Sequence, residues 1–221
     1  MRAWSEVVKA RAAKTRRKTR IQQENEERIL EAALEVFSTH GFRGATIDQI
    51  AEAAGMSKPN LLYYFRTKDA MHRLLIEQLL DNWLDPLREM DPDGNPLQEI
   101  RSYIRRKLEM ARDYPRESRL FANEILQGAP RVEDVLKGEL RELVDEKAKV
   151  IREWGRQGKM AKCDPYHLIF SIWATTQHYA DFDVQVRAVL GENMSGDGRF
   201  EDAARFLDLL FVDGLKAPGT S

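Results

Sequence analysis

Hydrophobic residues recur at helical spacing through the first third of the chain and predict three helices. The first pattern begins at Glu26 and ends at Gly41, and its inner face carries Ile29, Leu30, Ala33, Leu34, Val36 and Phe37. The other two lie within residues 46–65, where two apolar stripes flank Gly55. Glycine readily takes the left-handed conformation that ends a helix. We therefore expect three helices around one small core.

Capping signals mark the starts of the two shorter helices. Thr46 precedes the first, where a hydroxyl accepts the unpaired backbone N–H groups of the first turn. Ser57 precedes the second, which has Pro59 in its first turn. A turn of only a few residues between them is typical of a helix-turn-helix. The alternative is an ordinary helical hairpin whose tyrosines only cover the core.

The second short helix presents side chains suited to DNA. In a helix-turn-helix this helix enters the major groove while the first braces it against the backbone. Lys58 supplies a cation for phosphate, the Asn60 amide can pair with an adenine edge, and two tyrosines add hydroxyls. We predict DNA contacts from Arg43, Thr46, Lys58, Asn60, Tyr63, Tyr64 and Lys68.

The remainder of the chain also shows helical periodicity, and no strand alternation or internal repeat appears. Further helices are expected from about residue 69 to Pro86 and over 97–114, 118–126, 132–158, 164–190 and 200–215. The predicted class is all-α. We expect a basic N-terminal arm over residues 1–22, a helix-turn-helix domain over 23–68 and a larger helical domain over 69–221.

The last two predicted helices carry more apolar residues than one bundle needs. They are Phe170, Trp173, Tyr179, Phe182, Val186, Phe206, Leu209, Leu210 and Phe211. A four-helix interface between two copies would bury this surplus, so we predict a homodimer. Two-fold symmetry would then separate two reading helices by about one DNA turn, ~34 Å.

The charge is unevenly distributed along the chain. Residues 1–68 hold 13 Lys and Arg against 8 Asp and Glu, a balance of +5, which leaves −6 for residues 69–221 and −1 overall. Within the arm, Glu6 is the only acid. A basic end that coincides with a helix-turn-helix indicates nucleic-acid binding, with the arm along phosphates or in the minor groove. A solvated tail is the alternative.

Other function classes find no support in the sequence. The single cysteine, Cys163, gives no disulfide or zinc motif, and the four histidines show no metal-ligand spacing. His178 and Asp181, three residues apart, could form a metal or acid–base pair, but a single structural or pocket hydrogen bond from His178 is the simpler interpretation. No nucleophile motif or glycine-rich phosphate loop is present. We therefore expect no enzymatic activity, cofactor or metal, and, without an apolar leader or spanning segment, a cytoplasmic location.

Taken whole, residues 46–74 carry the motif of a known family. The pattern IxQIAxxAGxSxxxLLYYFxxKxxL runs from Ile47 to Leu74 with small spacing differences. The chain thus resembles TetR-family transcriptional regulators. The resemblance implies a homodimeric repressor that binds a palindromic DNA operator without ligand and releases it when a small molecule enters the C-terminal domain.

Four further strings narrow this resemblance. LLYYF at 61–65, RDYPxxSRLF at 112–121, GAP at 128–130 and DPxHLIFxIWAxTQHYADF at 164–182 resemble the pyrimidine-utilisation (Rut) repressor type. That resemblance implies uracil or thymine as the effector and assigns Trp83, Trp173 and Gln177 to its pocket.

The chemistry of these residues agrees with a pyrimidine effector. Trp173 and Gln177 lie four residues apart, on one helix face. Stacking of a flat ring on an indole contributes ~1–3 kcal/mol, and an amide both donates to and accepts from an imide edge. The alternatives are core aromatics with a satisfied amide, a regulator of another planar or amphipathic ligand, or an all-α dimeric scaffold.

Overall fold

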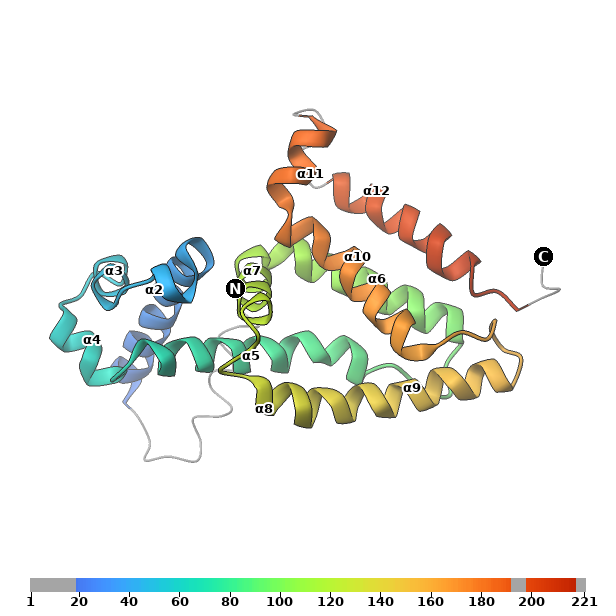
Figure 1. Cartoon of the computed structure of the whole chain (residues 1–221), viewed down its shortest axis with the longest axis horizontal. Coiled ribbons are helices and arrows are strands. Elements are labelled where there is room, and N and C mark those ends of the chain that lie inside the picture. The colour runs from blue at the N-terminus through green and yellow to red at the C-terminus, as the bar shows by residue number, and fades with distance from the viewer. Residues whose placement is uncertain (1–18, 192–197, 218–221) are drawn as a thin grey trace. The chain divides into compact units, whose positions relative to one another are not determined.

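The computed structural model describes residues 19–191 and 198–217, and within them every regular element is a helix (Figure 1). The all-α prediction is therefore confirmed. Of the basic arm predicted over residues 1–22, residues 1–18 lie outside the described part of the chain. None of the described helices is long and apolar enough to cross a membrane.

The chain divides into two compact units that are interleaved in sequence. The first unit comprises residues up to Asn82 together with Arg119–Glu133, and the second comprises Trp83–Ser118 and the chain from Asp134 onward. The domain boundaries predicted after residues 22 and 68 stay predictions. What the sequence did not indicate is that residues 119–133 belong with the N-terminal helices.

The first unit is built on α2 (Arg20–Gly44), α3 (Ile47–Ala53), α4 (Lys58–Tyr64) and the beginning of α5 (Lys68–Arg88). Thr19 caps α2 with a capping box, so this helix starts earlier than the apolar pattern indicated. Its core contains fully buried Phe37, Ile50, Leu61 and Met71.

The predicted turn chemistry is confirmed. The Thr46 side chain accepts from the Gln49 N–H while the Gln49 side chain accepts from the Thr46 N–H. The Ser57 side chain caps α4 by accepting from the Asn60 N–H. Between the two helices Gly55 has φ 63°, the left-handed conformation expected of it.

The second unit contains the end of α5 and the helices that follow. They are α6 (Pro96–Asp113), the first turn of α7 (Pro115–Leu126), the end of α8 (Glu133–Val135), π-helical η2 (Leu136–Leu140), α9 (Arg141–Arg156), α10 (Pro165–Asp181), α11 (Asp183–Leu190), α12 (Gly198–Leu207) and π-helical η4 (Asp208–Asp213). Its core centres on the packing of α6 against α10. α7 starts in this unit and ends in the first, and α8 begins at the last residue of the first unit.

Three predicted helix boundaries were wrong. α5 continues through Pro86 to Arg88, because a proline in the last turn interrupts little of the remaining backbone pairing. Pro115 starts α7 instead of preceding a later start, as its fixed φ suits a first helical position. The helix predicted up to Leu190 breaks at Phe182, with φ −114° and ψ 29°, although no glycine or proline marks the place.

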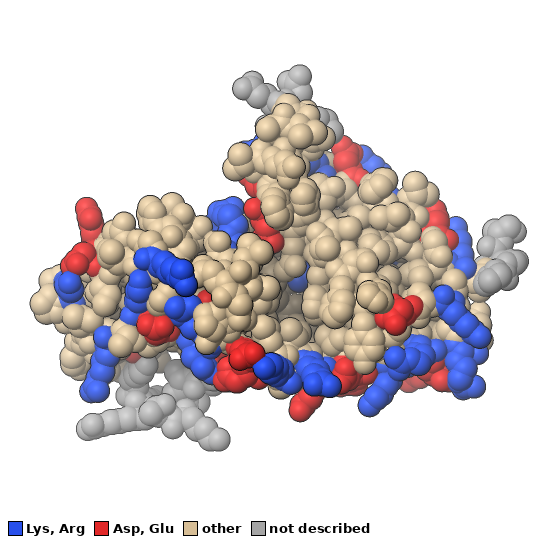
Figure 2. Space-filling model, viewed as in Figure 1, with Lys and Arg blue, Asp and Glu red and all other residues tan. Residues whose placement is uncertain are grey.

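The apolar surplus predicted at the end of the chain divides into two sets. Trp173, Tyr179, Val186 and Phe211 are buried or half-buried within this copy. The remaining residues are exposed, namely Phe170, Phe182, Phe206, Leu209 and Leu210, and Val184 and Val189 join them at 83% and 80% exposure. In Figure 2 the surface over α10 and α11 is largely uncharged, whereas Lys and Arg alternate with Asp and Glu along the edge formed by α9.

Candidate functional sites

The first candidate site is the outer face of α4. Leu61 anchors this helix in the core with no exposed surface. On the opposite side Lys58 and Asn60 are exposed, and Tyr63 is 72% exposed although it is a large aromatic residue. An exposed aromatic beside a cation and an amide is suited to base edges and phosphates.

Two predicted DNA contacts on α4 already have protein partners. Lys58 Nζ pairs with Asp48 Oδ2 of α3 at 2.9 Å. The Tyr64 hydroxyl accepts a hydrogen bond from Asn25 Nδ2 of α2 at 2.8 Å, and the Tyr64 ring meets the Tyr63 ring edge-on. Tyr64 therefore braces α4 against α2, while Tyr63 presents its ring outward.

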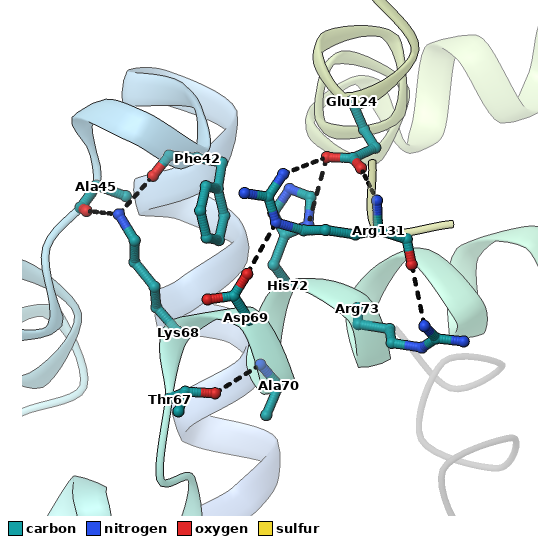
Figure 3. A network of polar contacts seen from close by, with 10 residues as sticks. All are labelled: Phe42, Ala45, Thr67, Lys68, Asp69, Ala70, His72, Arg73, Glu124 and Arg131. Atoms are coloured by element: carbon teal, nitrogen blue, oxygen red, sulfur yellow. Dashed lines mark hydrogen bonds and ion pairs between the residues drawn. The ribbon is translucent and has the colours of Figure 1, made fainter. Parts of the chain in front are cut away.

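The other three predicted DNA contacts lie at the end of α2, at the start of α3 and at the start of α5. Arg43 is exposed at the end of α2. Thr46 is exposed, but its hydroxyl is used in the capping box. Lys68 Nζ donates to the carbonyl oxygens of Phe42 and Ala45, at 2.7 Å each, and lies 4.4 Å from the Phe42 ring centroid (Figure 3). Two of the three Lys68 donors are thus occupied in holding the loop between α2 and α3.

A buried ion network joins residues 119–133 to this same part of the first unit. The Arg131 guanidinium contacts Glu124 at 3.1 Å and Asp69 at 3.0 Å, and lies 3.3 Å from the Phe42 ring centroid (Figure 3). Glu124, whose side chain has no exposed surface, also accepts the Arg131 backbone N–H at 2.9 Å. The network therefore ties the chain after α7 to the first turn of α5.

His72 lies at the inner end of this network. Its ring makes edge-on contacts with Phe37 and Phe42, and Nδ1 is 3.9 Å from Glu124 Oε2. Burial lowers the pKa of His72 to about 4, and the nearby Glu124 carboxylate only partly opposes this effect. The imidazole is therefore neutral at physiological pH. Sequence reasoning missed the network, because its members are far apart along the chain.

The second candidate site is a row of polar and aromatic side chains between α6 and α10. Trp173 Nε1 donates to the Tyr103 hydroxyl at 2.5 Å, which links the two helices. Burial raises the pKa of Tyr103, so this hydroxyl stays protonated. One turn beyond Tyr103 lies Lys107, and one turn beyond Trp173 lies Gln177, so both rows continue in parallel along the same interface.

Lys107 is the most unusual residue of this row. It is 4% exposed, and Nζ lies 4.4 Å from the Trp83 ring centroid. Burial lowers the pKa of Lys107 to about 8, while the Asp181 carboxylate opposes that change. Asp181 itself accepts a hydrogen bond from the Ser118 hydroxyl.

Two of the three predicted pocket residues contact residues that were not predicted. Trp83 reaches the row through Lys107, and Trp173 reaches it through Tyr103. Gln177 is half-buried on the face of α10 between Trp173 and Asp181. A signal for Lys107 was present in the sequence, because it falls seven residues after Ile100, on the apolar stripe of α6. Within residues 19–191 and 198–217, no group of three or more metal-ligating side chains occurs.

Known proteins resemble the chain over nearly its whole length. A model described as bacterial regulatory proteins of the tetR family matches residues 29–74, and one described as the C-terminal region of YcdC-like protein matches residues 76–218. The HTH-type transcriptional regulator RutR of Escherichia coli K12 is 46% identical over 202 residues, which cover 91% of this chain and 95% of the relative. The transcriptional activator FasR of Mycolicibacterium smegmatis is 35% identical over 66 residues, 30% of each chain.

Solved structures share the fold at lower identity. The putative transcriptional regulator SCO4942 of Streptomyces coelicolor has a TM-score of 0.66 at 22% identity, with 88% of this chain and 99% of that chain covered. AibR in complex with isovaleryl coenzyme A and operator DNA has a TM-score of 0.65 at 17% identity, with coverage of 84% and 97%. Together with the helix-turn-helix geometry, these relatives identify the chain as a member of the TetR family, a ligand-responsive, DNA-binding transcriptional repressor.

Proposed function

We propose that the chain is a cytoplasmic homodimer that represses genes of pyrimidine utilisation or related nitrogen metabolism, and that uracil or thymine releases it from a palindromic operator. The regulator itself catalyses no reaction in this proposal. The observation that carries the choice of effector is the row of Trp173, Gln177, Lys107 and Trp83 inside the second unit.

The chemistry of this row matches a small planar imide. Two indoles offer apolar faces for a flat ring, and stacking of a base on an aromatic contributes ~1–3 kcal/mol. Gln177 has no hydrogen-bond partner among the described residues, and its amide presents both a donor and an acceptor. Uracil and thymine have alternating carbonyl and N–H groups along one edge, so one amide can pair with two neighbouring positions of the ring.

Operator binding is assigned to the first unit. We propose that Tyr63 and Asn60 read base edges, that Lys58 and Arg43 neutralise phosphates, and that the basic arm adds further phosphate contacts. Thr46, Tyr64 and Lys68 act mainly by holding α3 and α4 in position, because their polar atoms are already bonded within the protein.

The route between effector and operator uses helices common to both units. α5 carries Trp83 near its end and Asp69 and His72 near its start, and α7 starts at Pro115 in the second unit and ends in the first. A ligand that favours one position of Trp83 therefore biases a helix that begins directly behind α4.

The proposed dimer uses the exposed apolar residues of α10, α11, α12 and η4. Phe182, Val184 and Leu209 are more than half exposed in one copy. Burial of such a surface against a second copy follows the two-fold arrangement that also suits a palindromic operator.

Selection of DNA from a random duplex pool tests this function. The purified dimer should enrich a palindromic sequence, and uracil but not cytosine should release it. Gln177→Ala should keep operator binding and lose release by uracil, whereas loss of both would make Gln177 structural.

Failure of the full-length protein to enrich any sequence at low salt would favour a dimeric helical scaffold without specific DNA binding. An enriched palindrome that uracil and thymine leave in place would favour another planar or amphipathic effector.

A further inference from the structure

Two buried lysines in the second unit differ in their partners. Lys147 is 5% exposed, and its Nζ donates to the Met90 carbonyl oxygen at 3.2 Å and pairs with Glu146 at 3.2 Å. Lys107 is equally buried, but among the described residues no hydrogen-bond acceptor or ion-pair partner contacts its Nζ. Burial of an ammonium without an acceptor is costly, and an acceptor supplied by a bound ligand would offset that cost.

The surroundings of Lys107 show what kind of group is missing. Trp83 of α5 lies against Nζ at 4.4 Å, a contact that stabilises charge but accepts no hydrogen bond. Asp181 of α10 is the charged group that acts on Lys107 from the facing helix, and it accepts from Ser118. Tyr103, one turn away on α6, receives the Trp173 N–H. The three donors of the ammonium therefore remain available.

We infer that Lys107 is the specificity-determining residue of the effector site, where its ammonium donates to a ring carbonyl oxygen of the bound pyrimidine. This inference rests on the proposed function and assigns the site a ligand class. The ligand is a neutral imide, with a carbonyl on each side of an N–H, as in uracil and thymine. In that arrangement Gln177 and Lys107 contact different positions of one ring from the two facing helices.

The inference predicts which pyrimidines are excluded. Cytosine has an amino group in place of one ring carbonyl, and an ammonium facing that amino group would meet a donor and stay unsatisfied. Sites built to hydrogen-bond a particular group reject analogues that lack it more strongly than apolar pockets do. A thiocarbonyl is a weaker acceptor than a carbonyl. Of 2-thiouracil and 4-thiouracil, the one that places sulfur at Lys107 should therefore bind more weakly than uracil.

Calorimetric titration of the full-length dimer tests this assignment. Lys107→Met keeps the length and apolar stem of the side chain but removes all three donors, and should lower the affinity for uracil by about 10- to 100-fold, as expected for a lost hydrogen bond to a charged group. Lys147→Met is the matched control, since it removes an equally buried ammonium, and should bind uracil within about threefold of the unchanged protein.

Discrimination among ligands separates a recognition role from a structural one. The unchanged protein should distinguish uracil from one of the two thiouracils, and Lys107→Met should lose that preference, which general loosening of the fold would not produce selectively. Unaltered uracil affinity and unaltered discrimination in Lys107→Met would overturn the inference and leave the proposed effector in place. Absence of uracil and thymine binding in the unchanged protein would overturn both.

Discussion

Two charged clusters, one in each unit, differ in the partners of their buried groups. In the first unit, Arg131 is enclosed by Glu124, Asp69 and the Phe42 ring, so each buried charge meets a partner of opposite sign. In the second unit, Lys107 contacts an aromatic face but no acceptor among the described residues, and Gln177 on the facing helix also has no partner. A buried carboxylate that meets a cation stabilises the fold, whereas an ammonium that contacts only an aromatic ring keeps its donors for a ligand. From this difference we propose a structural role for the Arg131 cluster and a recognition role for Lys107 and Gln177.

The largest expected effect on stability comes from breaking the ion pair between Arg131 and Glu124. Arg131→Met leaves the Glu124 carboxylate buried without its cation, and removal of one member of a buried ion pair typically costs about 3–5 kcal/mol. We expect the free energy of unfolding, measured in urea, to fall by about that amount. A loss below about 1 kcal/mol would mean that Arg131 is not needed to neutralise the buried Glu124 carboxylate.

The same type of substitution in the second unit should have the opposite effect on stability. The pKa of Lys107 is about 8 instead of 10.5, so at pH 7 burial of its charge costs about 3 kcal/mol at most. Lys107→Met should therefore leave the free energy of unfolding unchanged or raise it by about 1–3 kcal/mol while ligand affinity falls.

The pH dependence of that effect has a definite sign. The folded pKa of Lys107 is below its unfolded value, so the penalty is fully present below pH 8 and disappears as pH rises from 8 to 10.5. Over that window the unchanged protein should gain stability relative to Lys107→Met. A variant that is less stable than the unchanged protein at pH 7 would contradict the account of Lys107 as a strained, unpartnered cation.

An intermediate loss of stability is expected at acidic pH, because His72 beside the Arg131–Glu124 ion pair then becomes protonated. The folded pKa of His72, about 4, lies below its ordinary value of 6.5, so stability should be constant above pH 6.5 and fall as pH decreases towards 4. Between pH 6.5 and pH 5 the expected loss is about 2 kcal/mol. His72→Phe, which keeps an aromatic ring between Phe37 and Phe42, should reduce this slope. An unchanged slope would assign the acid sensitivity to other groups.

The smallest effect is on DNA affinity and concerns the exposed ion pair between Lys58 of α4 and Asp48 of α3. Lys58→Ala should weaken binding to all DNA sequences about equally and reduce the salt dependence by about one unit of slope. Asp48→Asn removes the competing carboxylate from Lys58 and should strengthen DNA binding slightly. Electrophoretic or anisotropy titrations at several salt concentrations measure both. A change at a single base pair in Lys58→Ala would indicate base reading instead of phosphate contact.

The helix-turn-helix could be predicted from the sequence because its determinants are local. Thr46, Gly55, Ser57 and Pro59 act within a few residues of their own positions, and each occupies its expected place. The break at Phe182 could not be predicted in this way, since neither glycine nor proline marks it and the packing of the helices decides it.

The clusters that distinguish the two units were also beyond local reasoning. Arg131 meets Asp69 across 62 residues of sequence, and Trp173 meets Tyr103 across 70. Lys107 left a local trace as a charge on the apolar stripe of α6, but only the structure shows that the Trp83 ring lies against its ammonium. Similarly, the sequence shows that Lys68 is a cation just after α4. Only the structure shows that its Nζ donates hydrogen bonds to two backbone carbonyl oxygens.

Calorimetric titration of the unchanged full-length dimer with uracil, with cytosine as the control, tests the proposed effector site. We expect saturable binding of uracil at one site per chain and no binding of cytosine, because Gln177 and Lys107 together would require an imide. Absence of heat with uracil and thymine would contradict the assignment of the row between α6 and α10 as a pyrimidine site.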